Sequence, residues 1–271
     1  MSIPAQPRTV VTGAAGGLGR ALCREVLRRG GSVVVSDLQH EAAAAAAADL
    51  GVPESHAVAC DVSDPAAVEQ LAVAAERVLG GVDLIVNNAG VAAAGRVGEI
   101  PLEDWRWSFG VNLWGVIYGC HAFVPRFRAQ GSGHVLNVAS TAGLISSPMM
   151  APYNVTKSGV VALSKTLFGE LAAEGIGVSV LCPTFFQTGI IDSARTTGDQ
   201  AMLGVARGLM SSAKIQADDV ARIALDAVAR DRLYVLPHRD GRMMWRLERH
   251  FPTAFYRLIP RLLRLRARRA E

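Results

Sequence analysis

Short runs of β-branched and apolar residues recur along the chain, and a longer stretch with apolar residues at helical spacing separates most of them. Such runs, without polar alternation, are typical of strands buried on both faces of a sheet. Strands that alternate with helices favour a parallel sheet covered on both faces. We therefore predict an α/β fold with a doubly wound parallel sheet, whose strands lie at residues 8–12, 32–36, 58–60, 82–86, 134–138, 177–182 and 233–236.

The helical stretches have recognisable starts. Residues 63–67 read Ser-Asp-Pro-Ala-Ala, a cap followed by an early proline, and 218–228 reads as a capped amphipathic helix. Seven consecutive alanines within 41–50 predict a surface helix, because alanine is the strongest helix former. Longer helices are expected at 103–129 and 152–174.

The first strand leads directly into Gly13-Ala-Ala-Gly-Gly-Leu-Gly19 and then into a helical pattern. Strand, glycine-rich turn and helix in this order favour a dinucleotide site of the Rossmann type. Gly13 makes the tight turn, Gly17 lets a pyrophosphate approach the backbone, and Gly19 allows close helix packing. The alternative for an isolated glycine turn is an ordinary strand-to-helix loop.

The second strand ends in Asp37, eighteen residues after Gly19. A carboxylate at this point accepts hydrogen bonds from both ribose hydroxyls of an adenosine and repels a 2′-phosphate. The next residue is Leu38, and no Lys or Arg lies nearby in sequence. We therefore predict NAD over NADP.

Tyr153 and Lys157 are four residues apart, so a helix that starts near Pro152 places their side chains on one face. Bringing a tyrosine pKa from ~10 to ~7 requires roughly 4 kcal/mol of phenolate stabilisation. An adjacent ammonium in a low-dielectric cleft supplies part of it. A phenol of this kind exchanges a proton with a substrate oxygen. We expect Ser140, at the end of the strand at 134–138, to present its hydroxyl to the same oxygen.

These motifs appear together in a characteristic order, and the chain thereby resembles the short-chain dehydrogenase/reductase family in its single-domain form. The resemblance extends from near the N-terminus to about residue 190. It rests on Thr12 through Gly19, Asp61, Asn87 through Gly90, Asn112, Ser140, Tyr153, Lys157 and Pro183 through Thr188.

The resemblance implies a role for each catalytic residue. Tyr153 would be the general acid/base, and Ser140 would orient the substrate oxygen. Lys157 would hold the nicotinamide ribose hydroxyls and lower the Tyr153 pKa, while Asn112 would hold a water that connects Lys157 to solvent. Taken one at a time, Ser140 and Asn112 also suit purely local hydrogen bonds.

The resemblance also implies the cofactor site. Asp61 has two open interpretations, a turn residue at the end of a strand or a hydrogen-bonding partner of the adenine edge. The complete set of expected cofactor contacts is Gly13, Gly17, Leu18, Gly19, Asp37, Asp61, Val62, Asn88, Ala89, Gly90, Tyr153, Lys157, Pro183 and Thr188.

One residue departs from the family pattern. Pro183 is usually followed by glycine, and here Thr184 follows it. Glycine at this point gives backbone freedom next to the nicotinamide, so Thr184 implies a more restricted loop.

Apolar residues dominate the segment that would close over the substrate. We expect Ser140, Tyr153, Phe185 and Phe186 to contact the substrate, and we predict a sizeable apolar secondary alcohol or ketone, such as a lipid, terpenoid or steroid-like molecule. The alternative, equally open, is a lid or a subunit contact. The other apolar residues of this region are Met149, Met150, Ile190, Ile191, Met202, Leu203, Leu209 and Met210.

Positive charge is concentrated at the C-terminal end of the chain. Residues 239–271 carry a net charge of +7, whereas residues 1–238 carry −3. We divide the chain into an oxidoreductase domain at 1–240 and a basic amphipathic extension at 241–271, interrupted at Pro252 and Pro260. We expect 241–259 to pack on the body or on a partner subunit, and peripheral membrane contact through 260–271 stays open.

Composition narrows the remaining possibilities. The four cysteines are scattered without a Cys-x-x-Cys pair, so we expect no metal site. The first residues do not resemble a signal peptide, no apolar run is long enough for a membrane span, and we expect a cytoplasmic protein. The negative charge of 1–238 disfavours a nucleic-acid partner.

Three readings of the site compete. The main one is an NAD-dependent alcohol dehydrogenase, which the resemblance expects to be a homodimer or homotetramer built through the helices at 103–129 and 152–174. A 3-oxoacyl-thioester reductase is the second, disfavoured because its usual cofactor is NADPH. The third is a non-catalytic nucleotide-sensing protein, against which the intact Ser140, Tyr153 and Lys157 argue.

Overall fold

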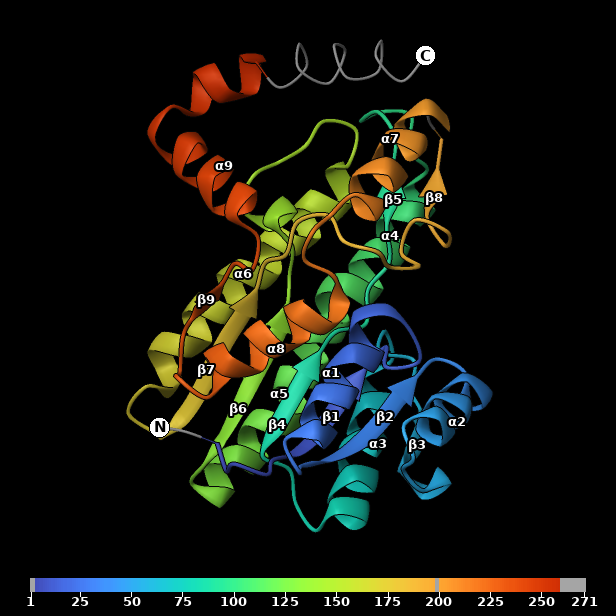
Figure 1. Ribbon diagram of the computed structural model, residues 1–271, viewed down its shortest axis with the longest axis vertical. Coiled ribbons are helices and arrows are strands. Elements are labelled where there is room, and N and C mark those ends of the chain that lie inside the picture. The colour runs from blue at the N-terminus through green and yellow to red at the C-terminus, as the bar shows by residue number, and fades with distance from the viewer. Residues whose placement is uncertain (1–2, 198–199, 259–271) are drawn as a thin grey trace.

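The central feature of the fold is a seven-stranded parallel sheet with strand order β3-β2-β1-β4-β6-β7-β9 (Figure 1). The structure is a computed structural model that describes residues 3–197 and 200–258. The predicted parallel sheet is confirmed, and its strands lie within a few residues of the predicted positions. They are β1 (Arg8–Thr12), β2 (Ser32–Asp37), β3 (Ala57–Ala59), β4 (Leu84–Asn87), β6 (Gly133–Val138), β7 (Ile176–Leu181) and β9 (Tyr234–Val235).

Helices cover both faces of the sheet, and successive strand residues bury their side chains on opposite sides. Val10 of β1 packs in the cluster beneath α3, α5 and α6, whereas Val11 packs beneath α1, α2 and α8. This is why the strand sequences are almost continuously apolar. The α-helices are α1 (Gly17–Arg28), α2 (His40–Asp49), α3 (Pro65–Leu79), α4 (Leu102–Phe109), α5 (Gly115–Gln130), α6 (Ala151–Leu171), α7 (Gln200–Ser211), α8 (Ala217–Val228) and α9 (Arg239–His250).

The strand order reverses between β1 and β4, and this reversal creates the crevice that the site uses. Helix α1 follows β1 on one face, whereas α5 follows β4 on the other. Two neighbouring strands whose helices leave in opposite directions open a crevice at their carboxyl ends, where ligands of such sheets bind.

The predicted helix at 103–129 is not continuous. A π-helical segment, Gly110–Trp114, separates α4 from α5. Such segments are rare and occur mostly at functional sites. Here it contains Asn112, which the sequence analysis placed in an ordinary helix.

The cap and early proline predicted at 63–67 are confirmed: Asp64 caps α3, its carboxylate accepts from the backbone N–H of Ala66, and Pro65 lies in the first turn. Two other details differ from expectation. Helix α8 begins after Gln216, which makes no side-chain cap hydrogen bond, so the capped start predicted there is wrong. A small parallel pair, β5 (Ala93–Ala94) with β8 (Arg195–Thr196), was not predicted.

Two helical glycines are expected to respond to alanine with opposite signs. A Cβ on Gly119 of α5 would overlap the Asn87 amide at the end of β4, whereas a Cβ on Gly169 of α6 has nothing within 4 Å. Gly119→Ala should lower the free energy of unfolding by about 2–3 kcal/mol, the usual cost of overpacking a core. Gly169→Ala should raise it by ~0.5–1 kcal/mol, since alanine loses less backbone entropy.

Urea denaturation followed by circular dichroism measures both changes. Equal effects of the two variants would contradict the close packing of α5 on β4.

Candidate active site

The glycine turn after β1 lies against the end of β4 with no room for side chains. Gly13 and Gly17 have positive φ angles of 61° and 49°, which favour glycine. A Cβ on Gly13 would lie 2.8 Å from the Ala89 Cα, and one on Gly19 would lie 2.7 Å from the Asn88 amide nitrogen. A Cβ on Gly16 would meet nothing within 4 Å, so the side of the turn away from β4 is open, as the approach of a pyrophosphate requires.

Side chains from β1 and β4 hold this turn in place. The Asn88 amide donates to the carbonyl oxygens of Thr12 and Gly13, at 2.8 and 3.0 Å. The Thr12 hydroxyl accepts from the N–H groups of Asn88 and Ala89. In the sequence, Thr12 is recognisable only as part of the glycine-rich motif. Its hydrogen-bond partners lie more than seventy residues away, so this structural role was not predicted.

Asp37 lies at the carboxyl end of β2 beside the glycine turn. One carboxylate oxygen accepts from the N–H of Ala15 at 2.9 Å, and the other accepts from the N–H of Leu38 at 2.8 Å. The carboxylate is therefore fixed, with lone pairs left to accept from ligand hydroxyls. Leu38 is 57% exposed and offers an apolar surface next to this carboxylate. Together with the open glycine turn, these residues fit a dinucleotide.

Asp61 and Val62 follow β3 near the same edge of the sheet. The Asp61 carboxylate accepts from both the N–H and the hydroxyl of Ser63, which makes it the turn residue that one interpretation anticipated. The Val62 side chain is buried close to Gly115. An adenine contact by either residue stays a prediction. Leu18, another expected cofactor contact, is buried in α1.

Ser140, Tyr153 and Lys157 meet where β6 ends and α6 begins. Helix α6 starts at Ala151, one residue before the expected Pro152, so Tyr153 and Lys157 share a face. The Lys157 ammonium lies 5.7 Å from the centroid of the Tyr153 ring and donates to the Val138 carbonyl at 2.9 Å. The Ser140 hydroxyl accepts from the Ala142 N–H at 3.1 Å, and its proximity to the Tyr153 phenol lowers the pKa of that phenol.

The protonation of this pair differs from the expectation. Burial raises the pKa of Tyr153, and the Ser140 hydroxyl opposes this only in part. Burial also lowers the pKa of Lys157 to about 8. Desolvation therefore dominates the shift, and the expected lowering of the tyrosine pKa toward 7 is wrong. The phenol keeps its proton at neutral pH.

Asn112 joins the same cluster from the π-helical segment. Its buried amide accepts from the Val91 N–H and donates to the Val91 carbonyl, both at 2.8 Å. A Cβ on Gly90 would lie 3.3 Å from the Asn112 amide oxygen and 3.4 Å from the Lys157 ammonium. The local hydrogen bonds are therefore present, and the water that Asn112 was expected to hold stays a prediction.

The loop after β7 closes the site from the other side. The Pro183 carbonyl accepts from the Thr141 N–H at 2.9 Å, and the Thr188 side chain lies beside Gly17, 3.5 Å from where a Cβ would be. Phe185 is 43% exposed and stays a candidate for substrate contact. Phe186 is 6% exposed and stacks on His238, so we correct its assignment from substrate to core.

Thr184 has an explanation that only the structure reveals. Its methyl group lies 2.7 Å from where a Cβ of Gly241 would be, so the side chain that replaces the usual glycine packs on the start of α9. Farther along, the Ser146 N–H donates to the Tyr256 hydroxyl at 3.1 Å. The C-terminal residues thus hold both loops beside the catalytic side chains, and sequence patterns could not have shown this.

The small pair β5 and β8 joins the segment after β7 to the loop before α4. Arg195 of β8 also contacts helix α4. Its guanidinium donates to the Asp104 carboxylate at 3.1 Å and lies 4.1 Å from the centroid of the Trp107 ring. The apolar residues Met202 and Leu203 fall outside the described side chains.

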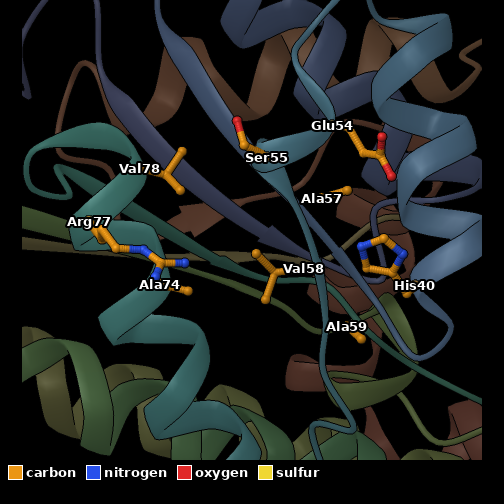
Figure 2. Close-up of a pocket in the computed structure, with 9 residues that line it drawn as sticks. All are labelled: His40, Glu54, Ser55, Ala57, Val58, Ala59, Ala74, Arg77 and Val78. Atoms are coloured by element: carbon orange, nitrogen blue, oxygen red, sulfur yellow. The ribbon is translucent and has the colours of Figure 1, made fainter.

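A separate groove of about 710 Å³ lies along the free edge of β3. Figure 2 shows His40 and Glu54 on one side of this strand and Arg77 and Val78 of α3 on the other. It contains none of the catalytic side chains, and β3 is at the opposite edge of the sheet from β7 and β9. We assign no chemistry to it.

Residues 3–197 and 200–258 contain neither a candidate metal site nor a candidate membrane span. No group of three or more His, Cys, Asp or Glu side chains is placed to hold a metal ion. No helix in these ranges is long and apolar enough to cross a bilayer.

Comparison with known proteins agrees with this geometry. A family model described as short chain dehydrogenase matches residues 8–199. The 1-deoxy-11-beta-hydroxypentalenate dehydrogenase of Streptomyces exfoliatus is 36% identical over 88% of this chain and 85% of its own length. The 2-dehydro-3-deoxy-L-rhamnonate dehydrogenase (NAD(+)) of a Sphingomonas species is 36% identical over 68% of this chain and 73% of its own.

A solved structure matches the fold closely. The crystal structure of a short-chain dehydrogenase/reductase from Burkholderia phymatum in complex with NAD has a TM-score of 0.82 and 37% identity, covering 89% of this chain and 92% of that one. The extent of these matches shows that the chain belongs to the short-chain dehydrogenase/reductase family, whose members act on CH–OH groups.

Proposed function

We propose that this protein is an NAD-dependent oxidoreductase that interconverts a secondary alcohol and a ketone, with a sizeable apolar substrate. The observation that carries the proposal is the meeting of Ser140, Tyr153 and Lys157 beside the dinucleotide crevice. Bound NAD supplies the hydride acceptor, and the chain supplies position and proton transfer.

The protonated phenol of Tyr153 suits proton donation to a ketone oxygen. The Ser140 hydroxyl lies beside the Tyr153 phenol, where it orients the same oxygen. With a pKa of about 8, the Lys157 ammonium is charged at neutral pH and favours the phenolate that proton donation leaves behind. Alcohol oxidation is the reverse and starts from the Tyr153 phenolate, which takes the alcohol proton and becomes the phenol.

Asp37 supports NAD rather than NADP. Its carboxylate is fixed by two backbone N–H groups at the end of β2, where a 2′-phosphate would meet its negative charge. The Sphingomonas relative named as NAD(+)-dependent points the same way. A 3-oxoacyl-thioester reductase that uses NADPH is disfavoured on this ground.

The apolar substrate class rests on the residues around the site and on the relatives. Phe185 is exposed, and Met149 and Met150 are half-buried just before the catalytic helix. The relative named for a hydroxypentalenate aligns over 88% of this chain, whereas the D-threitol dehydrogenase of Mycolicibacterium smegmatis aligns over 66%. The longer match favours the larger substrate over a small polyol.

An assembly of two or four copies is also part of the proposal. Trp114 and Val155, at 48% and 47% exposure, lie in the two helical regions expected to pair between subunits. Large apolar side chains this exposed are suited to a subunit interface.

Tyr153→Phe tests the reaction. It should lower kcat for NAD-linked oxidation of apolar secondary alcohols by about 10²–10⁴-fold, the usual contribution of a general acid/base, while NAD still binds. Tyr118→Phe, on α5, is the matched control and should leave kcat unchanged. Wild-type turnover retained by Tyr153→Phe would contradict the assigned role, and NAD binding without turnover by the wild type would favour the sensing alternative.

Asp37→Ala tests the cofactor preference. Because a hydrogen bond to a charged group contributes about 1.5–3 kcal/mol, KM for NAD should rise roughly 10- to 100-fold. The ratio of NAD to NADP efficiency should fall as the negative charge is lost. Asp49→Ala, an exposed acid at the end of α2, is the control. An unchanged ratio would mean that Asp37 does not meet the ribose.

Lys157→Met tests the cost of the buried ammonium. The pKa of Lys157 is about 8 in the folded protein, against an ordinary value of 10.5. Between these values the unfolded chain binds more protons than the folded one, so the contribution of Lys157 to stability rises with pH. The free energy of unfolding of wild type minus that of Lys157→Met should rise by about 1–2 kcal/mol from pH 7 to 9. Lys165→Met, at an exposed position of the same helix, is the matched control. A difference for Lys157→Met that does not change with pH would refute the shifted pKa.

A further inference from the structure

The C-terminal arm, which we define as residues 239–258, projects from the body beyond the sheet (Figure 1). It contains α9 and a second helical stretch at 252–258. Its inner side is attached to the body: Gly241 packs on Thr184, the Trp245 ring lies 5.1 Å from that of Tyr234, and Tyr256 accepts from Ser146. The packing predicted for 241–259 is therefore present in the described part, 241–258, on this side only.

The outer side of the arm is apolar and uncovered. Met243 and Leu247 are one helical turn apart, 58% and 47% exposed, and Phe251 and Leu258 are 64% and 50% exposed. The arm therefore has two faces, one attached to the loops of the active site and one without any partner in the described chain.

Arginines surround these apolar side chains. Arg239, Arg246, Arg249 and Arg257 are all exposed, and none forms a salt bridge with a carboxylate among the residues that the structure describes. The sequence of residues 259–271, whose structure is not described, adds five arginines and one glutamate. The exposed side of the arm is thus both apolar and strongly basic.

Charge decides which partner suits this surface. A second copy across a two-fold axis would bring arginines against arginines, which disfavours self-association. Nucleic acid would satisfy the arginines but leave Met243, Leu247, Phe251 and Leu258 without an apolar partner. An anionic bilayer can contact both the apolar side chains and the arginines of the arm. The apolar side chains enter the boundary of the acyl chains, and the arginines bind the lipid phosphates.

We propose that the outer face of the arm docks peripherally on an anionic phospholipid bilayer. Met243, Leu247, Phe251 and Leu258 insert at the interface, and the surrounding arginines bind the headgroups. Because Tyr256 joins the arm to Ser146, the loop between Ser140 and Tyr153 contacts the inner side of the arm, opposite the docking face. The docking is independent of the reaction and of its substrate.

Vesicle flotation of the full-length protein tests the docking. Vesicles of phosphatidylcholine alone are compared with vesicles that also contain about one third phosphatidylglycerol. Wild-type protein should bind the anionic vesicles at least about tenfold more strongly, and high salt should weaken that binding, because exposed charges are screened. The double variant Leu247→Glu, Phe251→Glu should lose about tenfold or more of the affinity.

Matched variants keep the result interpretable. Val73→Glu with Leu102→Glu adds the same charge at exposed apolar positions away from the arm and should leave most of the affinity intact. Arg246→Gln with Arg249→Gln should also lower it about tenfold, with no apolar residue changed. NAD binding and circular dichroism show whether each variant folds. If the double variant with two glutamates misfolds, the variant with Arg246→Gln and Arg249→Gln decides the question.

Several results would overturn the proposal. They are absence of binding to either vesicle, equal binding to both, or binding by the arm variants that matches wild type. A change in the oligomeric mass of the arm variants by analytical ultracentrifugation, with vesicle binding unchanged, would instead assign the face to a second copy.

Discussion

The structure depends on keeping a charged lysine where water is largely excluded. Lys157 is 2% exposed, and burial lowers its pKa to about 8. Within residues 3–197 and 200–258, its ammonium donates a hydrogen bond to the Val138 carbonyl at the end of β6. A buried ammonium costs stability unless its surroundings are fixed, so the rigid packing of α6 on β6 and β7 is a requirement of the site.

The parallel sheet meets that requirement and also brings the cofactor residues to the same edge. The carboxyl ends of β1, β2 and β4 carry the glycine turn, Asp37 and Asn88, while the end of β6 carries Ser140. Segments far apart in sequence therefore converge because every strand ends at one edge. Such an arrangement lets a hydride acceptor and a proton donor meet without a flexible connection between them.

The sequence was sufficient for features that depend on local chemistry. Buried parallel strands appear as β-branched runs, and the positive φ angles of Gly13 and Gly17 explain why glycine stands there. The four-residue step from Tyr153 to Lys157 follows from helix geometry alone. The strand positions and the convergence of the catalytic side chains were therefore predictable, although the assigned roles stay proposals.

Features that depend on distant contacts were not predictable. Phe186 has the character of a substrate contact, yet it stacks on His238, more than fifty residues away. Thr184 departs from the family pattern because Gly241 packs against it. The protonated state of Tyr153 depends on how far burial outweighs a neighbouring charge, which sequence spacing cannot give. Which side chains of the arm are exposed likewise depends on the side of α9 that faces the body.

Isotope transfer tests the central claim most directly. Apolar secondary alcohols with deuterium on the carbinol carbon would be incubated with the protein and NAD, and the reduced cofactor analysed by mass spectrometry. The account predicts deuterium in the reduced cofactor and formation of the matching ketone, with NADP much slower. Bound NAD that acquires deuterium from no alcohol in the panel, with no ketone reduced in the reverse direction, would contradict it.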